Sequence, residues 1–133
     1  MTLYPGTGFT HETGTGEGLG YTLNLPLDPH SGDDQYRSVW EQRVDPAVRA
    51  FEPDFLLVSA GFDAAKADPL ALMNVTPAGF AWMTDQVFAL ARDLCDGRLV
   101  SVLEGGYDLR SLSECVSVHL DRLMQGDGRE STA

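Results

Sequence analysis

Residues 55–59 read Phe-Leu-Leu-Val-Ser, and this nearly unbroken apolar run decides the fold. A short continuous run of this kind is typical of a strand that is buried on both faces in a parallel sheet. Residues 99–103, Leu-Val-Ser-Val-Leu, repeat the pattern and predict a second buried strand. Residues 21–25, Tyr-Thr-Leu-Asn-Leu, alternate in polarity and predict a third strand, which Pro26 ends.

Three stretches with helical spacing of apolar residues lie between and after these strands. The first covers residues 33–51, where Pro46 should kink or restart the helix. The second begins at the Thr-Pro pair of residues 76–77, an N-cap followed by the residue type favoured at the first helical position, and should end at Gly97. The third covers residues 109–123. Strands that alternate with helices predict an α/β fold, a parallel sheet with helices packed on its faces.

The composition is that of one folded domain with an acidic surface. The chain has 133 residues, of which 43% are hydrophobic and 22% charged. Its 20 acidic and 9 basic residues give a net charge of −11. This balance argues against direct nucleic-acid binding, which requires a basic surface, and it is compatible with a cationic substrate.

Targeting signals are not evident in the sequence. No apolar run reaches the 18 residues of a membrane span, and the first residues do not resemble a signal peptide. Cys95 and Cys115 have no neighbouring cysteine partners, so we expect a reduced, cytoplasmic setting without disulfides.

The first 20 residues contain six of the 14 glycines and predict a loop. A domain seldom opens with a long loop, so we expect that part of the domain precedes it. We expect residues 1–125 to form the folded portion, and the polar residues 126–133 to be a flexible tail.

The two loops that follow the apolar strands carry the candidate chemistry, because ligands of open parallel sheets bind beyond the carboxyl ends of the strands. One loop contains Asp63, a carboxylate suited to metal binding or to general-base work. The other contains Gly105 and Gly106, which allow close approach of the backbone, and Tyr107, whose phenol can donate to an oxyanion.

Each of these residues also has a purely structural interpretation. Asp63 could cap a turn, the glycine pair could form only a tight turn, and Tyr107 could be a packed ring. The joint position of the two loops makes the functional interpretation as good as the structural one. Among the other candidates, His119 should be a packed histidine of the last helix. Ser101 lies in a strand without a nearby histidine, which argues against a serine triad.

At these two loops the chain resembles the histone deacetylase superfamily, including its bacterial deacetylase-like and acetylpolyamine amidohydrolase members. The resemblance extends from about Tyr4 to Leu123, nearly the whole chain. The stretches that carry it are Tyr4–Gly8, Gly18–Gly20, Asn24–Leu27, Glu52–Asp54, Val58–Ala64, Asp68–Leu70 and Leu103–Leu109.

The resemblance implies a three-layer arginase/deacetylase-like fold and a role for each candidate residue. Asp63 would be one of two aspartates that bind a catalytic zinc ion, and Tyr107 would donate its hydroxyl to the acyl oxygen of the substrate. Leu70, Gly105 and Gly106 would line the substrate channel. Ala65 stands where bacterial relatives often have a histidine.

The family's other zinc ligands, an Asp-x-His motif, and its acid/base histidine pair lie upstream of the glycine loop and are not in this sequence. We therefore expect the C-terminal part of a zinc-dependent deacetylase, acting on acetyl-lysine or acetylpolyamine amides, and no activity from this part alone. One alternative is an inert piece, or a half that docks onto an N-terminal partner or self-associates. Another is a small phosphate- or nucleotide-binding α/β domain with Glu104, Gly105 and Gly106 as its anion loop.

Overall fold

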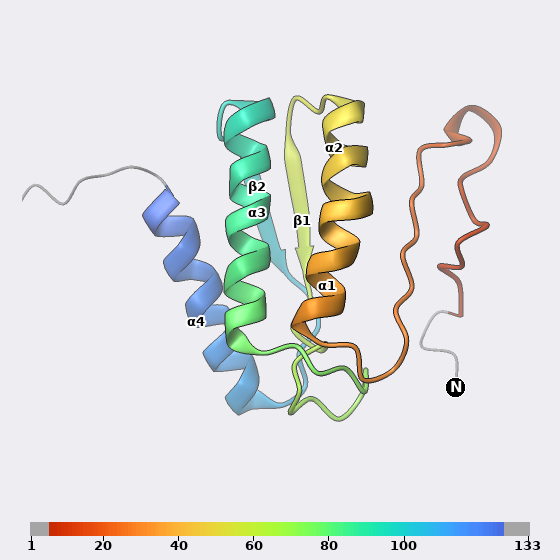
Figure 1. The fold of residues 1–133 in the computed structure, drawn as a ribbon. Helices are drawn as coiled ribbons and strands as arrows, with labels where there is room; N and C mark the ends of the chain where they lie inside the picture. The colour runs from red at the N-terminus through yellow and green to blue at the C-terminus, as the bar shows by residue number, and fades with distance from the viewer. Residues whose placement is uncertain (1–5, 127–133) are drawn as a thin grey trace, which may run out of the picture.

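The computed structural model describes residues 6–126, so the predictions for residues 1–5 and for the tail after residue 126 lie outside the described part. Figure 1 shows a layer of helices packed against two strands, with a long N-terminal segment at one side. The elements are η1 (Gly16–Gly18), α1 (Asp33–Val39), η2 (Trp40–Val44), α2 (Asp45–Phe51), β1 (Leu56–Ala60), α3 (Pro77–Cys95), β2 (Leu99–Leu103) and α4 (Leu109–Gly126).

The two apolar runs form a parallel pair, as the sequence predicts. Leu56 pairs with Leu99 at one end of the ladder and Ala60 with Leu103 at the other, so the strands are in register along their whole length. Helix α3 makes the crossover between them, because parallel neighbours cannot be joined by a tight turn. The prediction of a parallel sheet packed against helices is confirmed.

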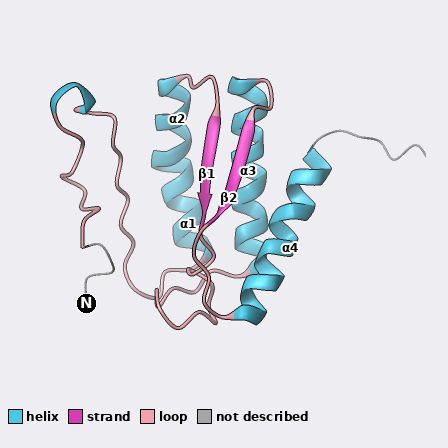
Figure 2. Cartoon of the chain, turned by 180° about the vertical axis from the view of Figure 1, so that it is seen from behind, coloured by secondary structure: helices cyan, strands magenta, loops and turns pink. Residues whose placement is uncertain are grey.

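The described helices cover one face of this sheet. The side chains of Leu56, Val58 and Ser101 face the helices and are half-buried, and Ser101 contacts α4. The side chains of Leu57, Val100 and Val102 point to the opposite face and are exposed, Leu57 by 70%. Figure 2 shows both strands in front of the helix layer. An apolar sheet face is thus left uncovered by residues 6–126.

Residues 21–25 do not form the predicted third strand, and that prediction is wrong. They are extended but have no strand partner in the described part of the chain. The Tyr21 amide donates to the nearby carbonyl of Gly18 at 3.1 Å, and the side-chain amide of Asn24 donates to the carbonyls of Phe9 and Glu12, at 3.1 and 2.9 Å. The Tyr21 ring lies edge-on to Phe51 of α2 at 6.1 Å. Alternation of polarity makes a strand only where a neighbouring strand supplies backbone partners.

Helices α1 and α2 form one helical path that is interrupted by a π-helical turn, η2. The Asp45 amide donates to the carbonyl of Trp40, five residues earlier, and Pro46 follows directly. In a regular α-helix the proline ring collides with the carbonyl four residues before it. The wider turn relieves this collision, so the expected disturbance at Pro46 takes the form of a π-turn rather than a break.

Helix α3 begins at the predicted cap. The Thr76 hydroxyl accepts from the Gly79 amide at 3.2 Å, and Pro77 occupies the first turn. The Asp33 carboxylate, at the start of α1, accepts from the Thr76 amide at 2.9 Å and from its hydroxyl at 2.6 Å. A side chain at Gly79 would collide with Asp33. One carboxylate therefore holds the beginnings of two helices together.

The best-buried apolar cluster lies below the strand ends rather than along the strands. It consists of side chains from the loop after β1, from the start of α3 and from α4, namely Phe62, Ala65, Val75, Phe80 and Cys115. This position makes the loop after β1 part of the core and fixes its course. No helix within residues 6–126 is both long and apolar enough to cross a membrane.

Candidate functional site

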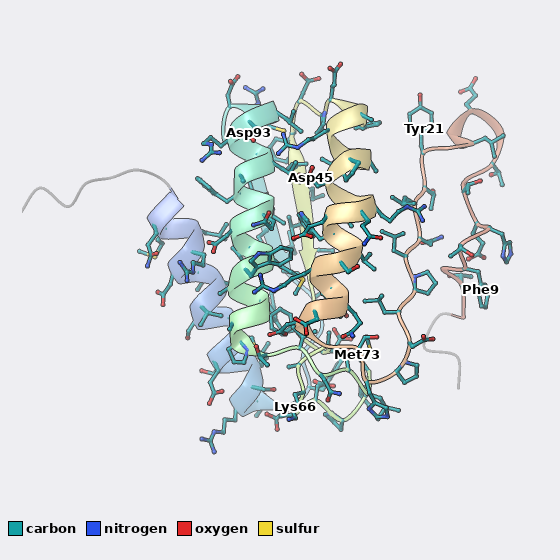
Figure 3. All side chains as sticks on the ribbon, in the orientation of Figure 1. Phe9, Tyr21, Asp45, Lys66, Met73 and Asp93 are labelled. Carbon is teal, nitrogen blue, oxygen red and sulfur yellow. The ribbon has the colours of Figure 1, made fainter. Side chains whose placement is uncertain are left out.

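The loops that follow β1 and β2 lie side by side because the hydrogen bonding of the sheet continues beyond the strand ends. The Glu104 amide donates to the carbonyl of Ala60 at 3.0 Å, and the Phe62 amide donates to that of Gly105 at 2.8 Å. In Figure 3, Lys66 and Met73 mark the loop after β1, at the end of the molecule where both strands terminate. The predicted meeting of the two loops at the carboxyl edge is therefore present.

Asp63 lies at the junction of the two loops. A Cβ atom at Gly105 would stand 2.9 Å from the Asp63 carboxyl carbon, and one at Gly61 would stand 2.9 Å from its Oδ1. Real Cβ atoms do not approach other atoms so closely, so a side chain at either position would displace the Asp63 carboxylate from this place. The glycine of the second loop is thus explained by close approach to a carboxylate.

The Asp63 carboxylate is half-buried, yet within residues 6–126 it accepts no hydrogen bond and forms no ion pair. A turn-capping aspartate would accept a backbone amide, so the capping interpretation does not describe Asp63. A half-buried carboxylate without a donor has lone pairs free for a cation.

Tyr36 of α1 is a neighbour of this carboxylate that the sequence reasoning missed. Burial raises the pKa of the Tyr36 phenol above its usual value of 10.0, and the negative charge of Asp63 raises it further. The sequence shows Tyr36 only as an apolar-face position of a helix, because its approach to Asp63 depends on the tertiary fold.

Tyr107 lies two residues beyond Gly105, and its side chain is 58% exposed, which excludes the interpretation as a packed ring. Gly106, between them, has a φ of +137° in the region that favours glycine, and a Cβ atom there would collide with Leu112. The Gly-Gly pair thus lets one residue pass the Asp63 carboxylate and the next adopt a positive φ, and the tyrosine that follows is exposed.

Asp68 is the second residue that the sequence reasoning did not assign to the site. Its side chain is buried, with 5% exposure, and its carboxylate accepts the Tyr107 amide at 2.6 Å and the Leu70 amide at 3.0 Å. The Asp-Pro pair of residues 68–69 is a turn signal in the sequence. Its link to Tyr107 spans 39 residues and has no local signature.

His119 is a packed histidine, as predicted, but the expectation that Ser101 has no nearby histidine is wrong. The Ser101 Oγ lies 2.9 Å from His119 Nε2, and the Thr84 Oγ1 lies 2.7 Å from Nδ1. Because Thr84 donates its hydroxyl to the carbonyl of Phe80 at 2.8 Å, His119 carries its proton on Nδ1 and accepts from Ser101. This network lies between β2, α3 and α4 and binds three elements together.

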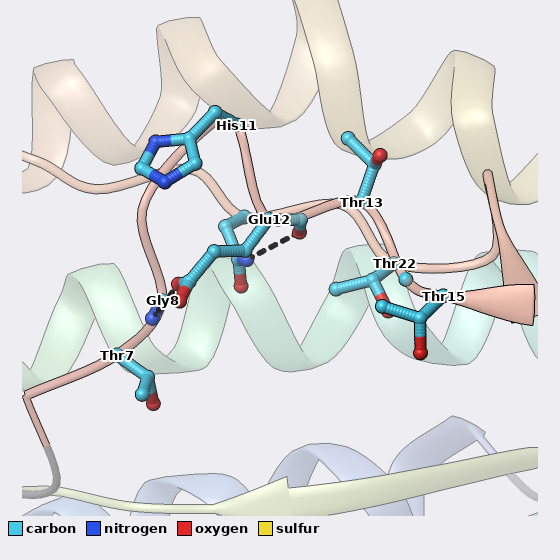
Figure 4. Close-up of a pocket in the computed structure, with 9 residues that line it drawn as sticks. Thr7, Gly8, His11, Glu12, Thr13, Thr15 and Thr22 are labelled. Carbon is cyan, nitrogen blue, oxygen red and sulfur yellow. Dashed lines mark hydrogen bonds between the residues drawn. The ribbon is translucent and has the colours of Figure 1, made fainter.

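The glycine-rich N-terminal loop forms a separate, shallow hollow of about 540 Å³. Figure 4 shows Glu12 at its centre, with the carboxylate accepting the amide of Gly8. The same carboxylate also accepts the amide of Phe9 at 2.6 Å. The residues that line the hollow all belong to the segment from Thr7 to Asn24. Within residues 6–126, no hydrogen bond joins this segment to the loops of Asp63 and Tyr107.

The strand-end loops are better suited to bind a metal ion than to bind an anion. An anion held at Gly105 would face the Asp63 carboxylate, which argues against the phosphate-binding alternative. Carboxylate oxygen is an accepted ligand of zinc, and catalytic zinc sites use three protein ligands. Among residues 6–126 no three histidine, cysteine or carboxylate side chains gather closely enough to hold an ion. A metal ion at Asp63 would therefore need further ligands from outside residues 6–126.

Comparison with known sequences gives one consistent result. A family model described as the histone deacetylase domain matches residues 1–123 of the chain. A probable deacetylase of Archaeoglobus fulgidus is 43% identical over 126 residues, which are 95% of this chain and 35% of that protein. Histone deacetylase 14, chloroplastic, of Arabidopsis thaliana is 44% identical over 128 residues, which are 96% of this chain and 30% of that protein.

Comparison with solved structures agrees. The crystal structure of the HDA15 HD domain superposes on this chain with a TM-score of 0.83 at 43% sequence identity. The matched region is 92% of this chain and 34% of the HDA15 chain. The chain thus spans about a third of the length of the curated relatives it matches.

Proposed function

The chain belongs to the histone deacetylase family, and from this premise we propose that its two strand-end loops form one part of a zinc-dependent deacetylase site. The observation that carries the proposal is the Asp63 carboxylate, fixed between Gly61 and Gly105 without a hydrogen-bond donor in the described residues. A carboxylate that lies against two glycines and accepts no hydrogen bond from the described residues is suited to bind a cation.

Asp63 would hold the zinc ion, with two further ligands from residues outside the described part. In such a site zinc supplies a Lewis acid for the amide carbonyl and for a water molecule. Asp63 would bind through a carboxylate oxygen, and the absence of a side chain at Gly105 leaves room for the carboxylate beside the second loop.

Tyr107 would act on the substrate itself. Water adds to the carbonyl carbon of the acetylamide, the C–N bond breaks, and acetate and the free amine are released. The Tyr107 hydroxyl donates a hydrogen bond to the oxygen on which negative charge develops. Its exposure and its position after the Gly-Gly turn make the phenol available for this contact.

Leu70, Gly105 and Gly106 would line the channel for the acyl-bearing chain. The exposed Leu70 side chain offers an apolar wall to methylene groups, and the glycines offer backbone without side chains. The net charge of −11 favours the approach of cationic molecules, which suits acetyl-lysine in a basic peptide or an acetylpolyamine.

The uncovered apolar face of the sheet supports the proposal that a further part of the domain packs on it. Parallel sheets are normally covered on both faces, whereas Leu57, Val100 and Val102 are exposed here. We propose that the remainder of a deacetylase domain packs on this face and brings the other zinc ligands to Asp63. Without that remainder, the face would promote self-association.

A chimera tests the proposal. This chain replaces the matching 126-residue stretch of the Archaeoglobus fulgidus deacetylase, and zinc content and hydrolysis of an acetyl-lysine peptide and of an acetylpolyamine are measured. The chimera should bind one zinc ion and hydrolyse at least one of these substrates, whereas the chain alone should do neither. A folded chimera without zinc or turnover, next to an active parent enzyme, would contradict the proposal.

A further inference from the structure

Asp68 joins two parts of the chain that each carry a candidate site residue. Its Oδ2 accepts the amide of Tyr107 at 2.6 Å and that of Asp108 at 3.3 Å. Its Oδ1 accepts the amide of Leu70 at 3.0 Å. One buried carboxylate therefore holds the backbone of the proposed oxyanion donor and the backbone of a proposed channel residue.

Burial of this carboxylate has a cost that its partners must offset. A charged oxygen withdrawn from water is destabilising unless it accepts hydrogen bonds, and hydrogen bonds to charged groups are the stronger ones. All three donors are backbone amides of the two loops, so the carboxylate is satisfied only when the loops are together. The geometry couples the position of Tyr107 to that of Leu70.

The exposure of Tyr107 makes such an anchor necessary. Its ring is 58% exposed, and Gly106 before it is the most flexible residue type, so packing of the side chain does not fix the backbone. The amide of Tyr107 is the point where the turn is held, and Asp68 holds it from a loop that the core fixes through Phe62 and Ala65.

We propose that Asp68 is the positioning residue of the site: it sets the place of Tyr107 relative to Leu70 and Asp63. This inference rests on the proposed function for its catalytic consequence, because Tyr107 must act on substrate for its position to affect turnover. Asp68 itself touches neither substrate nor metal and acts through the backbone of Tyr107.

The first test needs no turnover and uses the chain as it is. Amide hydrogen exchange of Tyr107, Asp108 and Leu70 is measured in the parent chain, in Asp68→Asn and in Asp68→Ala. In Asp68→Ala the Tyr107 amide should exchange about 10- to 100-fold faster, as expected for the loss of a charge-assisted hydrogen bond. Asp68→Asn keeps one acceptor oxygen and should show a smaller increase.

Asp33→Asn is the matched control. Asp33 is also a carboxylate that joins two elements through hydrogen bonds, but its partners are the amide and hydroxyl of Thr76. This variant should be destabilised while the exchange of the Tyr107 amide, relative to the β2 amides, stays as in the parent. Unchanged exchange of Tyr107 in Asp68→Ala would overturn the inference.

The second test is a double-mutant cycle in the chimera. Asp68→Ala should lower kcat by about 10- to 100-fold with zinc still bound, because a small displacement of a catalytic group costs a factor of that size. In the Tyr107→Phe background the same substitution should change kcat by no more than about twofold, since the group that Asp68 positions is already absent. An equal loss in both backgrounds shows a merely structural residue and overturns the inference.

The two tests separate this inference from the proposed function. An inactive, zinc-free chimera with native Asp68 contradicts the proposed function, and the catalytic consequence of Asp68 falls with it. The exchange measurement still decides whether Asp68 anchors Tyr107. If the Tyr107 amide of Asp68→Ala exchanges at the parent rate while the chimera with native Asp68 is active, the positioning role is contradicted and the proposed function stands.

Discussion

Gly105 illustrates how a missing side chain can define a site. The space that a Cβ atom would fill is occupied by the Asp63 carboxylate, at 2.9 Å from its carboxyl carbon. The sequence shows two glycines before a tyrosine, which is equally typical of a simple turn. Only the position of the carboxylate shows which glycine makes room for a ligand-bearing side chain and which provides an unusual φ angle.

Gly105→Ala should therefore destabilise the chain and displace Asp63. We expect a loss of about 1–3 kcal/mol in the free energy of unfolding, as for other overpacked positions, and a weaker affinity for zinc in the chimera. Gly18→Ala is the control, because a Cβ atom there meets nothing within 4 Å. Urea unfolding and zinc titration check the pair, and equal stability of the two variants would show that Asp63 has room to move.

Asp63 and Tyr107 should respond differently to substitution in the chimera. Asp63→Ala removes a ligand and should lose the zinc ion together with activity. Tyr107→Phe removes one oxyanion donor, so turnover should fall by about 100- to 1,000-fold while zinc remains bound. Zinc content by elemental analysis and kcat on an acetyl-lysine peptide distinguish the two. Retained zinc in Asp63→Ala would reassign the metal ligand.

At the scale of secondary structure, local patterns predicted the elements well where the causes are local. Thr76 and Pro77 start α3 as expected, and the apolar run at residues 55–59 became β1 with a shift of one residue. The stretch at residues 21–25 failed because a strand depends on a partner that its own sequence does not encode. Pro46 was correctly expected to disturb the helix, but the π-turn depends on how α1 and α2 pack.

The candidate site shows the same division. The loops that carry Asp63 and Tyr107 could be placed side by side from sequence because both follow parallel strands, whose carboxyl ends meet at one edge. Asp68 and Tyr36 could not, because their contacts with the site span long stretches of chain and follow no residue spacing. Side chains that approach a site from another element are visible only in the fold.

His119 joins β2, α3 and α4, and this network should make stability depend on pH. Burial lowers the pKa of His119 below its usual 6.5, so the folded state favours the neutral ring. The contribution of the neutral ring to the free energy of unfolding is complete above the pKa that His119 has in the unfolded state. It is lost as the pH falls through the pKa that His119 has in the folded state. Thermal midpoints between pH 8 and pH 5 should fall more steeply in the parent than in His119→Gln. Parallel curves would show that the ring does not gain a proton over this range on unfolding.

At the scale of the whole molecule, the uncovered sheet face is the main departure from an ordinary α/β domain. Leu57 is the register partner of Val100, Val102 follows on the same face of β2, and the three exposed side chains form one apolar surface. Monomeric proteins rarely expose contiguous apolar surface, and such surfaces mark interaction sites or aggregation. The chain should thus behave differently alone and within a complete domain.

Val102→Lys should reduce self-association of the isolated chain and its binding of a hydrophobic dye, because it places a charge on this apolar face. The same change in the chimera should lower stability and activity, since it would be buried there. Ser117→Lys, on an exposed position of α4, is the control and should do neither. Sedimentation and dye fluorescence check the prediction, which a strictly monomeric parent without dye binding would contradict.

The hydrogen bond between the Tyr107 amide and the Asp68 carboxylate joins two residues that are 39 positions apart in the chain. The whole of α3 lies in the segment between them. In kinetic terms, this contact is about as non-local as the pairing of β1 with β2, so it should form together with the sheet and not early in folding. Assembly of the site is then a late event in folding. A ligand that bridges the two loops would act on the chain as a removable crosslink, because it binds only the closed form and so slows its unfolding.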